Sequence, residues 1–129
     1  MKMVYAPQKG TILICNYQGL KAPEMDKLRP VVMLSSVSSR LAIVVPLSTT
    51  VPKPVRPWHY KVTLEEEITD YFNEKSCWAK CDMIMAVSFD RLSLPVARID
   101  HGKRVYKTIR ISEPDFEAVK SAAWRAISG

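Results

Sequence analysis

Arg29 has the residue type and position to bind an anionic group, because it stands where a polar stretch gives way to an apolar one. Pro30 restricts Arg29 to an extended conformation and opens the apolar run, which predicts a guanidinium at the rim of a sheet. A guanidinium is permanently charged and forked, and it therefore suits phosphate. The alternative is an ion pair with Glu24 or Asp26 in the polar stretch, and the residues alone favour that ordinary pairing.

Two further groups of residues have types that suit phosphate or proton chemistry. Ser48, Thr49 and Thr50 directly follow a second apolar run. Hydroxyl and backbone N–H groups at a strand end can hold a phosphate, although a turn that caps its own backbone is the commoner use. Lys80 and Asp82 are two positions apart, so on a strand their side chains would share a face. They can act as acid and base, or form a surface ion pair that contributes little.

His59 belongs to an alternating stretch in which it shares a face with Lys61. An imidazole there can touch phosphate or move a proton, but a lone exposed histidine usually does neither. The three cysteines, Cys15, Cys77 and Cys81, lack the spacing of a zinc site. The motifs of nucleotide-binding loops, zinc proteases and serine hydrolases do not occur. We therefore expect neither a metal site nor a cofactor.

Short strands must position these residues. β-Branched, apolar or alternating composition predicts strands over residues 11–17, 30–35, 41–47, 58–64, 76–85 and 105–111. A polar loop over residues 18–28 precedes Arg29, and loops of that length are often functional. The proline-rich residues 48–57 cannot form a central strand.

Two helices are expected, a short one over residues 66–72 and a longer one that begins at Ser112. Ser112 and Asp115 have capping-box spacing, which marks a helix start. The apolar positions of this helix recur at helical spacing and are Phe116, Val119, Ala123 and Ile127. Because strands outnumber helices and their links are short, we predict a mainly β (α+β) domain over residues 1–129. Its expected form is a strongly curved, barrel-like sheet with a C-terminal helix packed on it.

The charge of the chain is uneven. The net charge is +6 and the isoelectric point is near 9.3. Residues 51–61 and 91–110 are strongly basic, whereas the charged residues of 65–74 are all acidic. A basic surface concentrates polyanions, so RNA or DNA is a natural partner, although many basic proteins bind neither. Three cysteines without framework spacing favour a reducing compartment. With no apparent membrane span or signal peptide, we expect a soluble cytoplasmic protein.

Taken in order, several blocks resemble the PemK/MazF family, which includes Kid and consists of toxins of type II toxin–antitoxin pairs. Residues 9–13 (KGTIL) are similar to the family's opening R-G-(D/E)-I strand, and residues 24–32 (EMDKLRPVV) to E-x-x-G-x-R-P-V-L. Residues 42–49 (AIVVPLST) resemble V-V-x-P-(L/V)-T-(S/T), and residues 80–82 (KCD) resemble the R-C-D of the PemK/Kid branch. Residues 102–105 (GKRV) and the last helix resemble that branch's G-K-R-L and terminal helix.

The resemblance implies a homodimer of CcdB-like, SH3-like barrels that cuts single-stranded RNA at short sequences without a metal ion. In that chemistry the substrate's own 2′-hydroxyl attacks the adjacent phosphorus and leaves a 2′,3′-cyclic phosphate and a 5′-hydroxyl. By position, Asp82 is the candidate base, Lys80 the candidate acid, Arg29 the phosphate clamp and Ser48 the residue that orients the phosphate. The implied substrate-binding residues are Glu24, Thr49, Arg56, His59 and Lys61.

The same resemblance implies a cognate acidic antitoxin that occupies the RNA groove, and operator DNA bound only through that complex. Three positions depart from the family pattern. Lys27 replaces a loop glycine, Lys80 stands where the PemK/Kid branch has arginine, and Pro23 stands where it has histidine. The proton donor is therefore open between Lys80 and His59. The alternative function is a non-cleaving RNA- or protein-binding module of the same barrel, and a third is an unrelated SH3-like interaction domain; the basic segments favour the ribonuclease.

Overall fold

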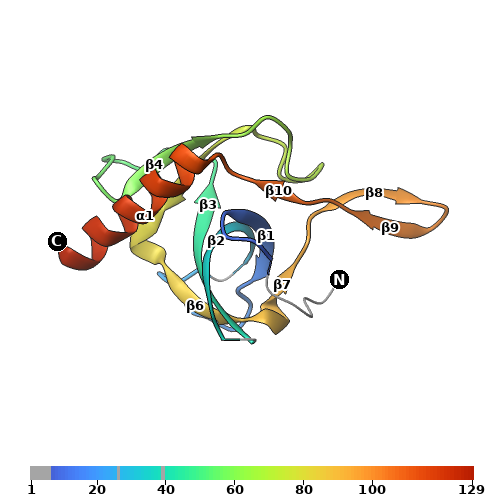
Figure 1. Cartoon of the computed structure of the whole chain (residues 1–129), viewed down its shortest axis with the longest axis horizontal. Helices are drawn as coiled ribbons and strands as arrows, with labels where there is room; N and C mark the ends of the chain where they lie inside the picture. The colour runs from blue at the N-terminus through green and yellow to red at the C-terminus, as the bar shows by residue number, and fades with distance from the viewer. Residues whose placement is uncertain (1–6, 26, 39) are drawn as a thin grey trace.

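The computed structural model describes residues 7–25, 27–38 and 40–129 (Figure 1). Strands are the main regular structure of the described residues, interrupted by two 3-10 turns and followed by one helix. The elements in order are β1 (Thr11–Asn16), β2 (Leu28–Ser38), β3 (Leu41–Ser48), β4 (His59–Thr63), β5 (Ser76–Lys80), η1 (Cys81–Met83), β6 (Met85–Ser88), η2 (Phe89–Arg91), β7 (Leu92–Ser93), β8 (Val96–Asp100), β9 (Lys103–Tyr106), β10 (Ile109–Arg110) and α1 (Glu113–Ser128).

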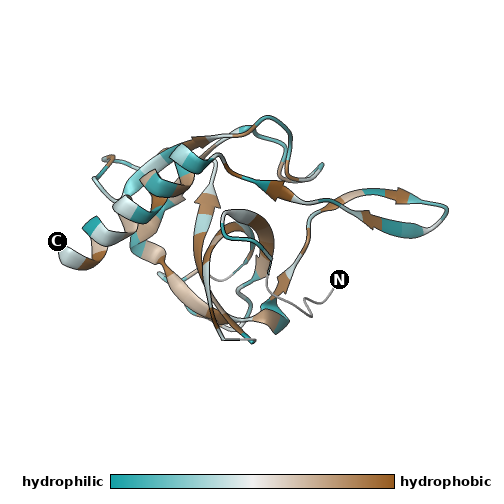
Figure 2. Cartoon of the chain, in the orientation of Figure 1, coloured by the Kyte–Doolittle hydropathy of each residue, from teal (hydrophilic) through white to brown (hydrophobic). Residues whose placement is uncertain are grey.

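Strands β1, β2 and β3 form the centre of the main sheet, as their apolar sequences predict. Within the described residues this sheet has eight strands, in the order β10-β1-β2-β3-β5-β4, with β6 paired to β3 and β7 to β1. Side chains that alternate along the central strands enter two different core clusters. Val32 lies in the cluster that also contains the helix, and Val31 lies in the cluster on the opposite face. Burial on both faces explains why these strands are almost continuously apolar (Figure 2).

The mainly β, α+β class predicted from the sequence is confirmed. The sheet is strongly curled around its apolar centre, and α1 packs against one side of it (Figure 1). Among the described strands, the hydrogen-bonded path runs from β10 to β4 without those two strands pairing, so the barrel-like curl is not closed. In the part of the chain that the structure describes, α1 and the 3-10 turns are too short or too polar to cross a membrane.

The single strand predicted over residues 76–85 is wrong. β5 pairs with the end of β3 and β6 with its beginning, and both run antiparallel to it. Leu47 pairs with Ala79, and Val44 pairs with Met85. Residues 79–85 therefore run alongside only residues 44–47 of β3, and the additional residues form the 3-10 turn η1.

The short helix predicted over residues 66–72 is also wrong, because this segment is a loop. Ile68 is 2% exposed and belongs to the core cluster beneath the helix. The Thr69 Oγ1 accepts a hydrogen bond from the Phe72 N–H at 2.9 Å, and the Thr69 N–H donates to the Phe72 carbonyl at 3.2 Å. Side-chain to backbone bonds of this kind compete with helical hydrogen bonds.

The strand predicted over residues 105–111 divides into two. β10 pairs with β1 in the main sheet, whereas β9 pairs with β8 in a separate hairpin that the sequence did not predict. The hairpin projects from the rest of the molecule (Figure 1), and its far end is hydrophilic (Figure 2). The chain leaves β9 at Lys107, whose N–H donates to the Pro95 carbonyl at 3.0 Å and closes the base of the hairpin.

Helix α1 begins where its capping residues predict. The Ser112 Oγ accepts a hydrogen bond from the Asp115 N–H at 3.2 Å. The Tyr60 hydroxyl donates to the Asp115 carboxylate at 2.6 Å, which ties β4 to the first turn and raises the pKa of Tyr60. Three of the four predicted apolar positions are buried, namely Phe116, Val119 and Ala123. The fourth, Ile127, is exposed, because the last turn extends beyond the strands that the helix covers (Figure 1).

Candidate functional site

The predicted site residues Arg29 and Ser48 lie on one face of the main sheet. Directly paired residues of antiparallel strands point to the same side, and side chains alternate along each strand. Val31 of β2 pairs with Pro46 of β3. Arg29 is two residues before Val31, and Ser48 is two residues after Pro46, so the side chains of Arg29 and Ser48 lie on the same face of the sheet as those of Val31 and Pro46. Since Val31 belongs to the core cluster on the side away from α1, Arg29 and Ser48 continue that side.

The same face extends onto β5 and β4. Ser48 pairs with Trp78, and Lys80 follows Trp78 by two residues along β5. In the next strand His59 pairs with Lys80, and Lys61 pairs with Trp78. Four strands therefore bring five predicted site residues to one surface, which we call the polar face: Arg29, Ser48, His59, Lys61 and Lys80.

Arg29 lines a cavity of about 350 Å³. Ser48 and Thr49 line the same cavity from the end of β3, and residues 71–74 line it from the loop between β4 and β5. Among the described residues, the buried Nε of Arg29 has no hydrogen-bond partner. A buried donor without a partner costs about 1–3 kcal/mol, and such an unsatisfied group is rare in a folded protein and marks Arg29 as a candidate functional residue.

The alternative for Arg29 was an ion pair within the polar loop. Glu24 instead accepts a hydrogen bond from the Lys21 N–H at 3.1 Å and lines a different cavity. Asp26 lies outside the described residues, so its pairing with Arg29 stays a prediction. The loop is also fixed at its start, because the Arg91 guanidinium donates to the carbonyl oxygens of residues 16 and 18, each at 2.9 Å.

Ser48 is 8% exposed, and its Oγ accepts a hydrogen bond from the Thr50 N–H at 3.2 Å. This is the local, self-capping turn that such residues more commonly form. The bond uses an acceptor position of the hydroxyl, so its hydrogen can still be donated to a ligand. Thr49 is exposed at the mouth of the Arg29 cavity.

His59 is not the exposed histidine that the sequence predicted, because its side chain is only 10% exposed. The His59 Nδ1 accepts a hydrogen bond from the Arg56 N–H at 3.0 Å. A nitrogen that accepts such a bond carries no proton, so the neutral ring holds its proton on Nε2. The Nε2 lies 3.8 Å from the Asp82 Oδ1, which is close enough for charge interaction but too long for a direct hydrogen bond.

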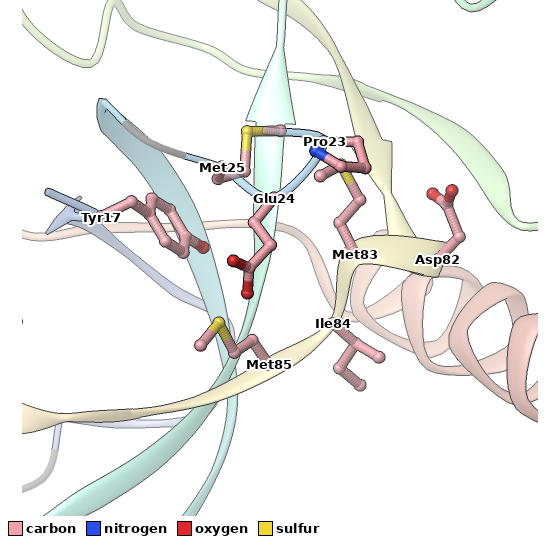
Figure 3. Close-up of a pocket in the computed structure, with 8 residues that line it drawn as sticks. All are labelled: Tyr17, Pro23, Glu24, Met25, Asp82, Met83, Ile84 and Met85. Atoms are coloured by element: carbon pink, nitrogen blue, oxygen red, sulfur yellow. The ribbon is translucent and has the colours of Figure 1, made fainter. Parts of the chain in front are cut away.

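Asp82 lies in the 3-10 turn η1, so the prediction that it shares a strand face with Lys80 is wrong. It lines a second cavity, of about 550 Å³, together with Glu24 and the apolar residues Met83 and Met85. Figure 3 shows that Tyr17 and Glu24 extend toward one another in this cavity, whereas the Asp82 carboxylate points away from Glu24. The structure thus groups Arg29 with the hydroxyl residues, and Asp82 with His59.

Sequence reasoning did not identify Tyr17 as a site residue. Tyr17 is 1% exposed and lines the Glu24 cavity (Figure 3), and its buried hydroxyl has no hydrogen-bond partner within the described part of the chain. Burial raises the pKa of Tyr17, which keeps this hydroxyl protonated as a potential donor. An aromatic residue just after an apolar strand is typical of a core position, so the sequence carried no signal for this arrangement.

Sequence reasoning also missed Tyr71 and Phe72, which line the Arg29 cavity. Their rings pack edge to face, with centroids 4.8 Å apart and planes at 88°. Tyr71 is 84% exposed, so its ring is open to a ligand from solvent. Two adjacent aromatic residues within an acidic, polar stretch were the available signal.

The cations of the basic segment over residues 91–110 fall into two groups, one bonded to loops and one exposed. Arg91, Lys107 and Arg110 donate hydrogen bonds to backbone carbonyl oxygens, and Lys107 also lies 3.5 Å from the Glu66 carboxylate. These cations fix loops. The exposed cations of the projecting hairpin are Arg98, Lys103 and Arg104. Arg56, which also belongs to the predicted binding set, is exposed on the loop before β4.

The three cysteines are unsuited to nucleophilic catalysis. Burial raises the pKa of Cys15 and of Cys77 to about 11, and of Cys81 to about 12. A thiol must lose its proton to act as a nucleophile, so these groups stay inert near neutral pH. Among the described residues, no group of three or more histidine, cysteine, aspartate or glutamate side chains is placed to hold a metal ion.

The chain is similar to known proteins in sequence and in fold. The family described as "PemK-like, MazF-like toxin of type II toxin-antitoxin system" matches residues 8–122. The protein YifN of Escherichia coli (strain K12) is 34% identical over 114 residues, covering 72% of this chain and 76% of YifN. An uncharacterized protein of Haemophilus influenzae (strain ATCC 51907 / DSM 11121 / KW20 / Rd) is 29% identical over 100 residues, covering 68% and 70%. A solved mycobacterial structure, an endoribonuclease in complex with its cognate antitoxin, matches with a TM-score of 0.63 at 14% identity, covering 95% of this chain and 96% of that one. This last likeness confirms the predicted fold type.

Proposed function

The chain belongs to the PemK-like, MazF-like toxins of type II toxin–antitoxin systems, and from this premise we propose that it is an endoribonuclease that cuts single-stranded RNA. The observation that carries the proposal is the buried, unpartnered Nε of Arg29 in a cavity that also offers the hydroxyls of Ser48 and Thr49. A forked cation beside hydroxyl groups matches the oxygens of a phosphodiester. The structural relative described as an endoribonuclease supports the role.

In the proposed reaction the 2′-hydroxyl of the substrate attacks the adjacent phosphorus. Asp82 removes the proton from this hydroxyl, the O2′–P bond forms, and the P–O5′ bond breaks. The leaving O5′ takes a proton from the enzyme, so the products are a 2′,3′-cyclic phosphate and a 5′-hydroxyl. Arg29 and Ser48 stabilise the negative charge that builds on the phosphoryl oxygens during the transfer. None of these steps uses a metal ion.

Lys80 is the proposed proton donor. It lies on the polar face opposite His59, and its ammonium group carries a proton that it can release to the leaving oxygen. His59 has a different role in this proposal. Its Nδ1 accepts the bond from the Arg56 N–H and its Nε2 faces the Asp82 carboxylate, so the ring orients Asp82.

RNA reaches the site over the polar face, with Arg56 and Lys61 contacting its backbone and Glu24 contacting a base in the second cavity. The exposed cations of the β8–β9 hairpin attract RNA from a distance. The proposal includes a homodimer, an acidic antitoxin that covers the RNA groove, operator DNA bound through the antitoxin complex, and a cytoplasmic location.

Incubation of the purified protein with a single-stranded RNA in EDTA tests the proposal. We expect fragments that end in a 2′,3′-cyclic phosphate and begin with a 5′-hydroxyl, and no cleavage where the nucleotide before the scissile phosphate is 2′-deoxy. Arg29→Ala and Asp82→Asn should abolish cleavage without unfolding the protein. The exposed residues Arg40 and Glu117 provide the matched controls Arg40→Ala and Glu117→Gln, which should cleave as the parent does.

Three results would overturn the proposal. Fragments with 5′-phosphate ends would exclude attack by the 2′-hydroxyl, and cleavage that requires a divalent metal would exclude the proposed acid and base. Normal cleavage by both Arg29→Ala and Asp82→Asn would show that the site lies elsewhere. RNA binding without any cleavage would instead establish a binding module of the same fold.

A further inference from the structure

Tyr71 stands beside the arginine of the proposed site. In the part of the chain that the structure describes, Arg29 lines two cavities, and Tyr71 and Phe72 line both of them. The first is the cavity that contains Ser48, and the second, of about 360 Å³, also contains Lys27. An aromatic pair therefore lies at both of these cavities.

The ring of Tyr71 is exposed but supported. Its exposed fraction is 84%, but the ring packs edge to face against Phe72, with the ring centroids 4.8 Å apart. Phe72 is half-buried and packs against the core cluster beneath the helix. The two hydrogen bonds between Thr69 and Phe72 close the turn that carries both rings. A ring supported in this way loses little conformational freedom when a flat ligand stacks on it.

The charges around Tyr71 select a neutral ligand for its ring. Asp70 and Glu74 flank the aromatic pair in the chain, and Glu74 also lines the first cavity. These carboxylates repel a phosphate placed over the ring, whereas Arg29 attracts one a short way along the same cavity. A nucleotide offers both parts, because its phosphate is charged and its base is flat and neutral. Unstacked bases of single-stranded RNA commonly stack on exposed aromatic side chains.

We propose that Tyr71 stacks on the nucleobase next to the phosphate bound by Arg29, and so positions single-stranded RNA for cleavage. The inference rests on the proposed ribonuclease function and adds a positioning residue that the family resemblance does not supply. Tyr71 makes no bond to the reacting atoms, so it affects binding of the RNA more than the chemical step.

Three variants test this inference. Tyr71→Ala removes the stacking surface, Tyr71→Phe keeps it, and Trp124→Ala removes a comparably exposed aromatic ring (65%) on the far helix as a control. Binding is measured with an RNA that carries a 2′-deoxy nucleotide at the scissile position, and cleavage with the corresponding all-ribose RNA. We expect Tyr71→Ala to weaken binding by about 5- to 150-fold and to raise KM with little change in kcat. Tyr71→Phe and Trp124→Ala should match the parent.

Abasic nucleotides identify the base that Tyr71 contacts. One position should exist at which removal of the base weakens binding to the parent protein but has no further effect on Tyr71→Ala. If the parent cleaves RNA and Tyr71→Ala binds and cleaves equally well, the stacking inference is wrong and the proposed function stands. If the parent neither binds nor cleaves any RNA, the proposed function fails and the inference fails with it.

Discussion

Arg29→Met is expected to stabilise the folded protein and to abolish RNA cleavage. The Nε of Arg29 is buried, and folding takes this donor from water while the residues that the structure describes provide no acceptor in return. Methionine keeps a flexible apolar stem and removes the donor. A buried polar group that lacks a partner costs about 1–3 kcal/mol, and this is the expected increase in the free energy of unfolding.

The expected increase corresponds to an easily measured change in Tm. An unfolding entropy of about 2.1 cal/mol/K per residue gives about 270 cal/mol/K for the 129 residues of the chain. Division of about 1–3 kcal/mol by this entropy gives a rise in Tm of about 4–11 °C. The substitution also removes one positive charge from a chain of net charge +6, which lowers self-repulsion. Arg40→Met, at an exposed position in the turn between β2 and β3, controls for this charge effect.

Thermal unfolding near pH 7 and cleavage of a single-stranded RNA are measured on the same preparations. Arg29→Met should melt above both the parent and Arg40→Met, and should cleave at least about 100-fold more slowly, as expected when a donor that stabilises a transition state is removed. A lower Tm for Arg29→Met would refute this reasoning. It would show that the guanidinium makes a stabilising contact within the folded chain, such as an ion pair in the polar loop.

Three other predictions concern stability, pH and salt. Tyr60→Phe removes the 2.6 Å bond to the Asp115 carboxylate and should lower the free energy of unfolding by about 1 kcal/mol, seen as a fall in Tm; an unchanged Tm would show that the bond contributes nothing. Burial raises the pKa of Cys77 to about 11, so this thiol ionises at a lower pH in the unfolded chain than in the folded one, and the free energy of unfolding should fall as the pH rises from about 9 toward 11. In thermal melts at successive pH values, Cys77→Ala should lose up to about 2–3 kcal/mol less of this free energy than the parent does over the same interval. Replacement of Lys103 and Arg104 by glutamate should weaken RNA binding. It should also reduce the slope of log K against log salt by about 0.7 for each phosphate that is no longer neutralised. A slope equal to that of the parent would exclude the hairpin from the RNA interface.

The parts of the fold that the sequence predicted correctly depend on local pattern. The apolar runs of β1, β2 and β3 are long enough to identify strands without knowledge of their neighbours. The start of α1 follows from a capping interaction between Ser112 and the Asp115 N–H, which are three positions apart. The position of Arg29 at the start of β2 follows from the boundary between a polar loop and an apolar strand.

The parts that the sequence did not predict depend on pairing between distant segments. The turn that contains Asp82 exists because β5 and β6 take different registers along β3, and no pattern within residues 76–85 encodes that difference. The loop around Ile68 replaces a helix because the core accepts that side chain and Thr69 satisfies the backbone nearby. The burial of His59 follows from its contact with a backbone N–H and with the turn that carries Asp82.

These non-local features change the chemistry available at the site more than they change the fold. On a continuous strand, Asp82 and Lys80 would be neighbours on one surface and would form an ordinary ion pair. The turn η1 instead moves Asp82 next to the His59 Nε2, while Lys80 stays on the polar face of β5. The proposed acid and base thus belong to different elements, so in the proposed reaction the carboxylate takes a proton from one side of a phosphate while the ammonium group releases one on another. A reaction that removes a proton from O2′ and delivers one to O5′ requires this separation.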